Sequence, residues 1–334
     1  MAQVRSDFVE GMKKQGYRYF YEERDTLPEV APAIFREETL DAAWTQWTMV
    51  VEEGEPEEKT SELSDAPVGD TIEGFTIHLR ARTFHKRKVW SKDTVRDHQK
   101  IENLVQQSVR NWARGSHSKK EKFYAGFFNY GGYTAGRDDT FDQGITGQSQ
   151  GYTAGDGIYD GTAASVSPFF SLSGASVVHV NKSNTSYYNS ITGALNEGNL
   201  ETALILLEYT NAKSERDISF AQTADTLLVP THLQRTAKKL IESPGTSSEA
   251  HEGVINPYQD RLKIIVWRTF LTDTDAWFVG IAKRGLVMGK RQEPEIAMFI
   301  DQRNGAFEAV VDERYGGTVE DYRTWIGSNL STAA

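Results

Sequence analysis

The stretch that decides the fold of this chain is residues 91–114, SKDTVRDHQKIENLVQQSVRNWAR. Ser91 stands at a helix N-cap position, and Asp93 lies in the first turn, where a carboxylate favours the positive end of the helix dipole. The apolar residues that follow recur at three- and four-residue spacings: Val95, Ile101, Leu104, Val105, Val109 and Trp112. This spacing predicts a helix of about six turns with a single apolar stripe.

The residues that lead into this helix, 72–90, have a different period. In IEGFTIHLRARTFHKRKVW, apolar and basic side chains alternate, with Ile77 and Leu79 on one side and Arg80 and Arg82 on the other. Such alternation predicts an extended strand or arm. A long basic strand that leads into a long, one-sided helix is unusual in a small-molecule enzyme and common in a protein that packs against copies of itself.

Length and composition limit the class of protein. A chain of 334 residues exceeds the usual single domain, and 38% hydrophobic residues suffice for a packed core. No run approaches the roughly 18 apolar residues of a membrane span, and the N-terminus lacks a signal-peptide core, so we expect a cytoplasmic address. The absence of cysteine excludes disulfides, cysteine nucleophiles and thiolate metal sites. A net charge of −10 argues against a general nucleic-acid binder.

The charges are unevenly distributed along the chain. Residues 52–73 hold nine acidic residues and one lysine, a net charge of −8, whereas residues 78–122 hold thirteen Lys or Arg and four Asp or Glu, a net charge of +9. Two solvated surfaces would account for this pattern. That is the usual explanation of a run of charges, and electrostatic complementarity, in which the acidic segment of one subunit meets the basic arm of another, is a second; both can hold.

The remaining segments indicate a mixed α+β protein. Residues 1–43 predict a short helical pattern followed by a mostly extended arm, and residues 44–51 predict a strand that pairs with 72–90 around a loop tip. Residues 130–168, rich in Gly, Thr and Asp, predict a long surface loop. The later elements that we expect are an irregular helical continuation at 119–129, helices at 199–210 and 233–242, and strands at 226–229, 262–271, 276–282, 295–301 and 306–312.

Several of these segments carry a resemblance to a known family. Residues 226–243, TLLVPTHLQRTAKKLIES, are followed by Ile255-Asn256-Pro257, by LKIIVW at 262–267 and by DAWFV at 275–279. In this order they resemble the major capsid proteins of tailed bacteriophages, in particular the major head subunit of Mu-like phages, and the resemblance spans roughly residues 8–326. The glycine-rich stretch 130–195 is longer than the family would suggest.

The resemblance implies the Hong Kong 97 phage capsid fold, an α+β fold with an N-terminal arm, an extended two-stranded loop, a long spine helix, and peripheral and axial domains. On this chain, the parts would be an arm at 1–44, the extended loop at 45–90, a peripheral domain with the spine helix and a Gly-rich insertion at 91–195, an axial domain at 196–285, and return strands with a C-terminal tail at 286–334.

The function implied by the resemblance is that of a structural protein. It would assemble with itself through pentamers and hexamers into the icosahedral shell around phage double-stranded DNA, in the host bacterial cytoplasm, and end in the virion capsid. Other partners would be scaffolding, portal and decoration proteins and, non-specifically, DNA at the inner wall, with no membrane. Two alternatives remain: an encapsulin-like nanocompartment shell of the same fold, and a phage fibre or adhesin, which the glycine-rich middle suggests.

The functional residues of such a protein would lie at its interfaces. The basic residues that we expect to contact a neighbouring subunit are Arg80, Arg82, Lys86, Arg87 and Lys88. The acidic residues that we expect as their partners are Glu52, Glu53, Glu57 and Glu58.

Patterns that would indicate an enzyme are present but lack their context. Gly147-Gln148-Ser149-Gln150-Gly151 fits a nucleophile elbow, yet no apolar strand precedes it and no helix follows it. The aspartates between 138 and 160 do not follow the calcium-loop pattern, and no pair of histidines has the spacing of a zinc site. We therefore expect no catalytic residue, no cofactor and no metal.

Overall fold

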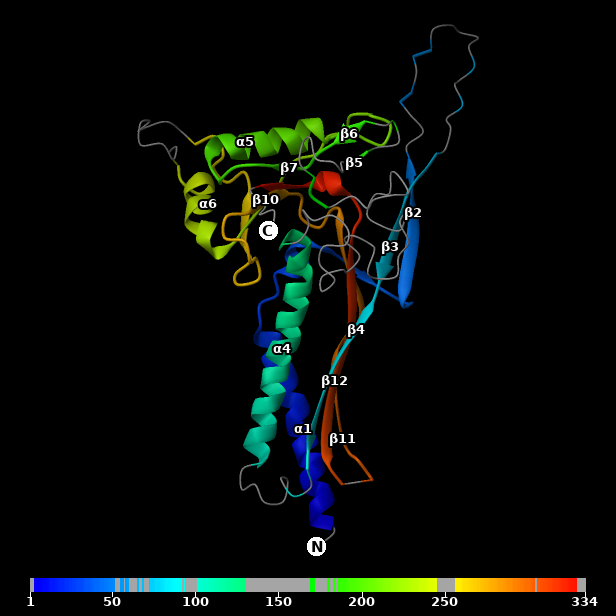
Figure 1. Cartoon of the computed structure of the whole chain (residues 1–334), viewed down its shortest axis with the longest axis vertical. Helices are drawn as coiled ribbons and strands as arrows, with labels where there is room; N and C mark the ends of the chain where they lie inside the picture. Colours follow the sequence, from blue (N-terminus) through cyan, green and yellow to red (C-terminus); the bar gives the residue numbers. More distant parts are fainter. Residues whose placement is uncertain are drawn as a thin grey trace.

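The computed structural model describes most of the chain. The described residues are 3–51, 55–56, 58–59, 65, 68, 72–91, 93, 101–129, 169–171, 179–180, 183, 185–244, 256–303 and 305–328. The predicted helix start at 94–100, the glycine-rich loop at 130–168 and the patterns within that loop lie outside them. The molecule is elongated, with a narrow stem and a wider lobe at one end (Figure 1).

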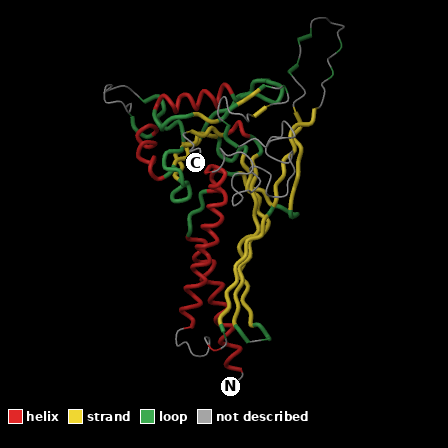
Figure 2. Tube along the Cα trace, in the orientation of Figure 1, coloured by secondary structure: helices red, strands yellow, loops and turns green. Residues whose placement is uncertain are grey.

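The stem consists of two long helices beside a long sheet, in two layers (Figure 2). Its sheet has the strand order β1-β11-β12-β4. The elements are helices α1 (Gln3–Thr26) and α4 (Ile101–Asn129), and strands β1 (Arg36–Thr39), β4 (Arg82–Trp90), β11 (Leu286–Ile300) and β12 (Phe307–Val319). β1 runs parallel to β11, whereas β12 is antiparallel to both of its neighbours.

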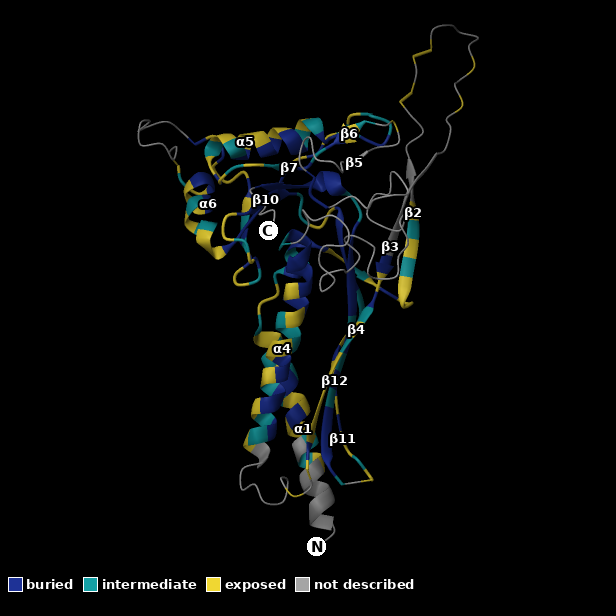
Figure 3. Cartoon of the chain, viewed as in Figure 1, coloured by how far each residue is buried: buried dark blue, intermediate teal, exposed yellow. Residues whose placement is uncertain are grey.

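The apolar stripe of α4 faces the sheet as the spacing predicts. Val105, Val109 and Trp112 are buried in a core that Met298 and Phe307 complete from the strands. The same helix continues without a break to Asn129, so the prediction of an irregular continuation beyond residue 114 was wrong. Aromatic side chains extend the stripe there, because Phe123, Tyr124, Phe127 and Phe128 recur one, three or four residues apart and are all buried (Figure 3).

The N-terminal segment differs from the prediction of a mostly extended arm. It forms α1, a helix of 24 residues that lies along α4. Gly16 lets α1 lie close to β11, because a Cβ atom there would meet the Cε atom of Met298 on that strand. Phe20 is fully buried against the sheet, and Glu23 pairs with Arg114 of α4 at 2.6 Å. Tertiary contacts therefore stabilise a helix that its polar sequence indicates only weakly.

The predicted strand at 72–90 is divided at Ala81. Its first part, β3 (Ile72–Arg80), pairs antiparallel with β2 (Trp44–Val51) and forms the two-stranded hairpin that the sequence predicts. Its second part, β4, instead joins the stem sheet beside β12. The division lies where the chain crosses Gly316 of β12, and a Cβ atom on Gly316 would approach the carbonyl oxygen of Arg80 to 2.1 Å.

The lobe is built on a second sheet with the strand order β7-β13-β10-β8-β9. Its strands are β7 (Ser190–Ile191), β8 (Thr226–Val229), β9 (Lys263–Val266), β10 (Trp277–Gly280) and β13 (Trp325–Ser328). Its helices are α5 (Glu197–Ile205), which continues as a π-helical turn at Leu206–Thr210, and α6 (Gln234–Ile241). The sequence predicts these helices and strands β8, β9 and β10, but it contains no indication of β13.

Several short elements complete the described chain. They are α2 (Ala31–Ile34), β5 (His179–Val180), β6 (Ser186–Tyr187) and the 3-10 turns Thr231–Leu233 and Tyr322–Thr324. None of the described helices has the length and apolar character needed to cross a bilayer.

The strands β11 and β12 are about twice as long as predicted. They were expected at 295–301 and 306–312, but they span Leu286–Ile300 and Phe307–Val319. Register shifts between Lys290 and Glu295 interrupt the alternation of apolar residues in β11, and Gly316 and Gly317 interrupt it in β12. The pairing nevertheless continues across both irregularities, from Leu286 opposite Val319 to Ile300 opposite Phe307.

We predict that Gly316→Ala destabilises the subunit by about 1–3 kcal/mol, because the added methyl group has no room beside the backbone of Arg80. Urea unfolding of the disassembled subunit measures the change in free energy. The matched control is Gly11→Ala in α1, where no atom lies within 4 Å of the added Cβ and helix propensity favours alanine by about 1 kcal/mol. Equal stability of the two variants would contradict the proposed role of Gly316.

Candidate interaction surface

The strand β4 carries most of the basic residues that the sequence singles out, and it lies at the edge of the stem sheet. One side of β4 pairs with β12, and no other strand of the described residues pairs with its second side. Edge strands rich in Lys and Arg resist uncontrolled pairing with other chains and also offer a surface for a specific partner.

Two lysines of β4 lie on the face of the sheet that the helices cover. Lys86 is opposite Val311 and Lys88 is opposite Ala309, and both partners belong to the stem core. The amino group of Lys88 donates a hydrogen bond to the hydroxyl oxygen of Ser108 on α4 at 2.8 Å and lies 5.2 Å from the centre of the Trp90 ring. Lys88 therefore joins the edge strand to α4 within one subunit.

Arg87 lies on the opposite face of the sheet and has a partner in its own chain. Its guanidinium group contacts the carboxylate of Glu308 at 2.6 Å, and the side chain of Glu308 is only 3% exposed. Val89 and Phe299 flank Glu308 in the same cross-strand row and are partly exposed. Sequence reasoning missed the link between Glu308 and Arg87, because the two residues lie 221 positions apart.

The two arginines on either side of Ala81 lie where the hairpin meets the stem. Arg80 ends β3 opposite Trp44 and is exposed, whereas Arg82 begins β4 opposite the buried Tyr315 and is half-buried. Of the four acidic residues expected to meet the basic arm, Glu58 is described and exposed. Glu52, Glu53 and Glu57 lie outside the described residues, so contacts between subunits stay a prediction.

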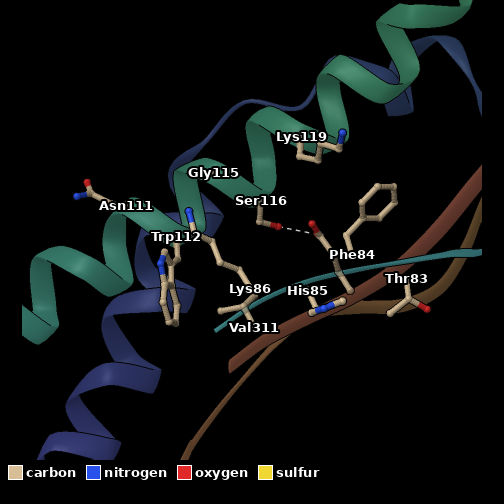
Figure 4. Close-up of a pocket in the computed structure, with 11 residues that line it drawn as sticks. Thr83, Phe84, His85, Lys86, Asn111, Trp112, Gly115, Ser116, Lys119 and Val311 are labelled. Atoms are coloured by element: carbon tan, nitrogen blue, oxygen red, sulfur yellow. Dashed lines mark hydrogen bonds between the residues drawn. The ribbon is translucent and has the colours of Figure 1, made fainter. Parts of the chain in front are cut away.

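A cavity of about 430 Å³ separates β4 from α4 in the middle of the stem (Figure 4). Phe84 and Lys86 of β4 line one side, and Trp112 and Lys119 of α4 line the other. Glu313 of β12 also lines it, and the hydroxyl group of Ser116 donates a hydrogen bond of 2.6 Å to the Glu313 carboxylate.

Glu313 occupies a position that the rest of its strand would give to an apolar residue. Phe307, Ala309, Val311 and Tyr315 share its face of β12 and are buried, and Glu313 itself is 4% exposed. Burial raises the pKa of the Glu313 carboxyl above its ordinary value. A carboxylate at an apolar position of an alternating strand is a signal that the sequence contained, although β12 was expected to end at residue 312.

Within the residues that the structure describes, no three His, Asp or Glu side chains come together as a metal site requires. The serine of the elbow-like pattern at 147–151 and the aspartates between 138 and 160 lie outside those residues.

Comparison with known proteins identifies the fold. No protein-family model matches the sequence, and no curated protein sequence matches it. A chain from Mycobacterium phage Patience is similar in structure with a TM-score of 0.52 at 12% identity, covering 100% of this chain and 89% of that one. A chain from the mature capsid of bacteriophage PhiM1 has a TM-score of 0.52 at 10% identity, with 92% and 89% covered.

These likenesses cover both lobe and stem, and they confirm the predicted fold class. The chain has the α+β Hong Kong 97 fold of phage capsids, with α4 as its long helix.

We predict that Arg87→Ala destabilises the isolated subunit, because it leaves the buried Glu308 without a counterion. Breaking a fully buried pair costs about 3–5 kcal/mol. Because the Arg87 side chain is 55% exposed, we expect a smaller loss of about 1–2 kcal/mol in urea unfolding.

Two further variants make this test specific. Adding Glu308→Gln to Arg87→Ala should recover most of the stability, since the buried charge is then removed. Arg303→Ala is the matched control, because its side chain is 89% exposed beside Asp301 and its loss should cost under about 0.5 kcal/mol. If Arg87→Ala loses no more unfolding free energy than Arg303→Ala, the ion pair of Arg87 with Glu308 contributes nothing to the stability of the subunit.

Proposed function

We propose that this chain is a major capsid protein that assembles with copies of itself into the icosahedral shell of a tailed bacteriophage. The observation that carries the proposal is the fold, which is shared with chains of phage Patience and of the mature PhiM1 capsid over at least 89% of every chain compared. The proposal concerns a structural protein, whose function lies in its interfaces.

The shape and charge of the subunit support assembly. The stem is long and thin, and the β2–β3 hairpin extends away from it, so one subunit presents separate faces to several neighbours (Figure 1). Burial of apolar surface would supply the affinity, at about 25 cal/mol per Å² before the entropic cost of association. The acidic segment 52–73 and the basic strand β4 would set the register between neighbours.

The parts of the subunit then have separate roles. Of residues 45–90, the β2–β3 hairpin would overlap a neighbouring subunit as the extended loop, whereas β4 belongs to the stem sheet. Residues 196–285 would form the axial domain around the symmetry axes. The shell would enclose double-stranded DNA, assemble in the host cytoplasm and engage scaffolding, portal and decoration proteins. A net charge of −10 suits an inner wall along which DNA moves, because a strongly cationic wall would bind phosphates tightly.

Electron microscopy of the protein expressed alone or with its scaffold, paired with sedimentation, tests this proposal. We expect closed shells or large ring-shaped oligomers, whose diameter would give the number of subunits. Dimers or trimers under all conditions would contradict a shell. Nucleic acid inside particles purified from infected cells would distinguish a phage capsid from an encapsulin-like compartment, which holds protein cargo.

We predict that the double charge reversal Arg80→Glu and Arg82→Glu reduces assembly and leaves a folded subunit, since both arginines lie at the base of the hairpin. Sedimentation measures the assembled fraction, and circular dichroism confirms the fold. The compensating reversal Glu57→Lys and Glu58→Lys should restore particles in this background. Normal shells from the arginine double variant would contradict a role in assembly.

A further inference from the structure

The outer face of α6 concentrates positive charge on a chain that is acidic as a whole. Arg235, Lys238 and Lys239 are all exposed, whereas the net charge of the chain is −10. The other long helical segment of the lobe, α5 with its π-helical turn at residues 197–210, contains three glutamates and no Lys or Arg. The two helices of the lobe are therefore oppositely charged.

The packing of α6 holds these three cations in one row. The inner side of the helix is fixed in the core of the lobe by Ala237, Leu240 and Ile241, so the opposite side faces outward (Figure 3). The cations follow one another at spacings of three and four residues, which places them on one helix face within about 6 Å of helix length. The row lies at the edge of the lobe away from the β2–β3 hairpin (Figure 1).

The cations line an open groove of about 620 Å³ together with neutral hydrogen-bonding side chains. Thr231, Gln234 and Ser243 supply hydroxyl and amide groups there. Glu242 is the one acidic side chain among the described residues of the groove, and its carboxylate lies 3.7 Å from the amino group of Lys238, with both side chains 52% exposed. Such an exposed ion pair is weak, so it leaves Lys238 able to bind another anion.

The lining of the groove suits a nucleic acid better than a protein. Arg, Lys, Ser, Thr and Gln are among the side chains that donate hydrogen bonds to phosphate oxygens in protein–DNA complexes. None of the described residues of the groove is aromatic, Leu, Ile, Val or Met, whereas interfaces between proteins usually centre on buried aromatic anchors. Duplex DNA carries one negative charge per roughly 1.7 Å of its axis, so a row of cations meets several phosphates at once.

We propose that the groove on α6 binds the phosphate backbone of double-stranded DNA without regard to base sequence. The proposal rests on the proposed function, in which the shell encloses DNA, and the side of the lobe that bears α6 would then face the interior.

The number of cations limits the strength of this binding. Each phosphate contact contributes about −0.9 to the slope of log affinity against log salt concentration, so three contacts give a slope of about −2.7. A fourfold rise in salt concentration then weakens binding about fortyfold. Contacts of this strength hold DNA at the wall and still let it exchange as the particle fills.

Fluorescence anisotropy of the disassembled subunit with a labelled DNA duplex of mixed sequence tests the groove. The test variant combines Arg235→Gln, Lys238→Gln and Lys239→Gln. The matched control combines Lys14→Gln, Lys122→Gln and Arg303→Gln, which are three exposed cations outside the lobe. Both variants lower the net charge by the same amount, so they separate a local site from a general effect of charge. Circular dichroism confirms that both remain folded.

We expect the test variant to bind DNA at least about tenfold more weakly than the natural chain at low salt and to lose the salt slope of about −2.7, whereas the control changes affinity less than about threefold. Equal losses in the two variants, or no binding by the natural chain at low salt, would overturn the DNA site. Either result would leave the proposed function intact, because electron microscopy observes closed shells independently. Failure of the natural chain to form particles would instead overturn the proposed function, and with it the enclosed DNA as the ligand.

Glu242→Gln tests the groove in the opposite direction, with a gain that loss of structure cannot imitate. Removing the carboxylate beside Lys238 should tighten DNA binding about two- to fivefold. Glu201→Gln, at an exposed position of α5, is the control with the same change in charge. A Glu242→Gln variant that binds DNA no more tightly than Glu201→Gln would contradict the assignment of the site to this groove.

Competition with polyglutamate decides between DNA and an acidic protein segment as the ligand. Unlabelled duplex should displace the labelled duplex from the natural chain at a concentration at least several times lower than polyglutamate of equal total charge. The reason is that the duplex is stiff and holds its charges in place, whereas a flexible peptide loses entropy when it is ordered. Polyglutamate that competes as well as DNA would assign the groove to an acidic protein segment and overturn the proposal.

Discussion

The structure depends on one helix that belongs to two cores. α4 has 29 residues and therefore extends about 44 Å. Its first half packs Val109 and Trp112 against the stem sheet, and its second half inserts Phe128 among Trp267, Phe278 and Trp325 of the lobe. Because a helix is stiff, this shared element fixes the position of the lobe relative to the stem. The closed shell that we propose would require such a fixed relation between lobe and stem.

A buried carboxylate reinforces the same helix where its two halves meet. Glu121 accepts hydrogen bonds from the backbone N–H groups of Val30 and Ala31 and from the indole N–H of Trp267, at 2.5 Å in the last case. Burial raises the pKa of Glu121, although these three donors act in the opposite direction. The residue joins the N-terminal segment, α4 and the lobe, and its cost as a buried charge is offset by the number of donors directed at it.

The sequence predicted those elements whose own pattern determines them. α4, α6, β8 and the β2–β3 hairpin have regular apolar spacing, and the structure contains them. α1 was not predicted as a long helix, because Gly16 and Phe20 acquire their packing partners on β11 and α4 from distant parts of the chain. The cavity with its buried Glu313, and the pairing of Arg87 with Glu308, could not be predicted either, since strand register decides which residues meet.

The register of β4 also places its basic side chains alternately on the two faces of the stem sheet. Side chains of β4 alternate between faces, so neighbouring residues in one cluster of charge have different partners. Arg87 and Lys88 neutralise or bind groups of their own subunit, which makes them part of its stability. Lys86, in contrast, lines the cavity between β4 and α4. The net charge of +9 between residues 78 and 122 therefore overstates the charge available to a neighbouring subunit, because Arg87 and Lys88 already have partners in their own chain.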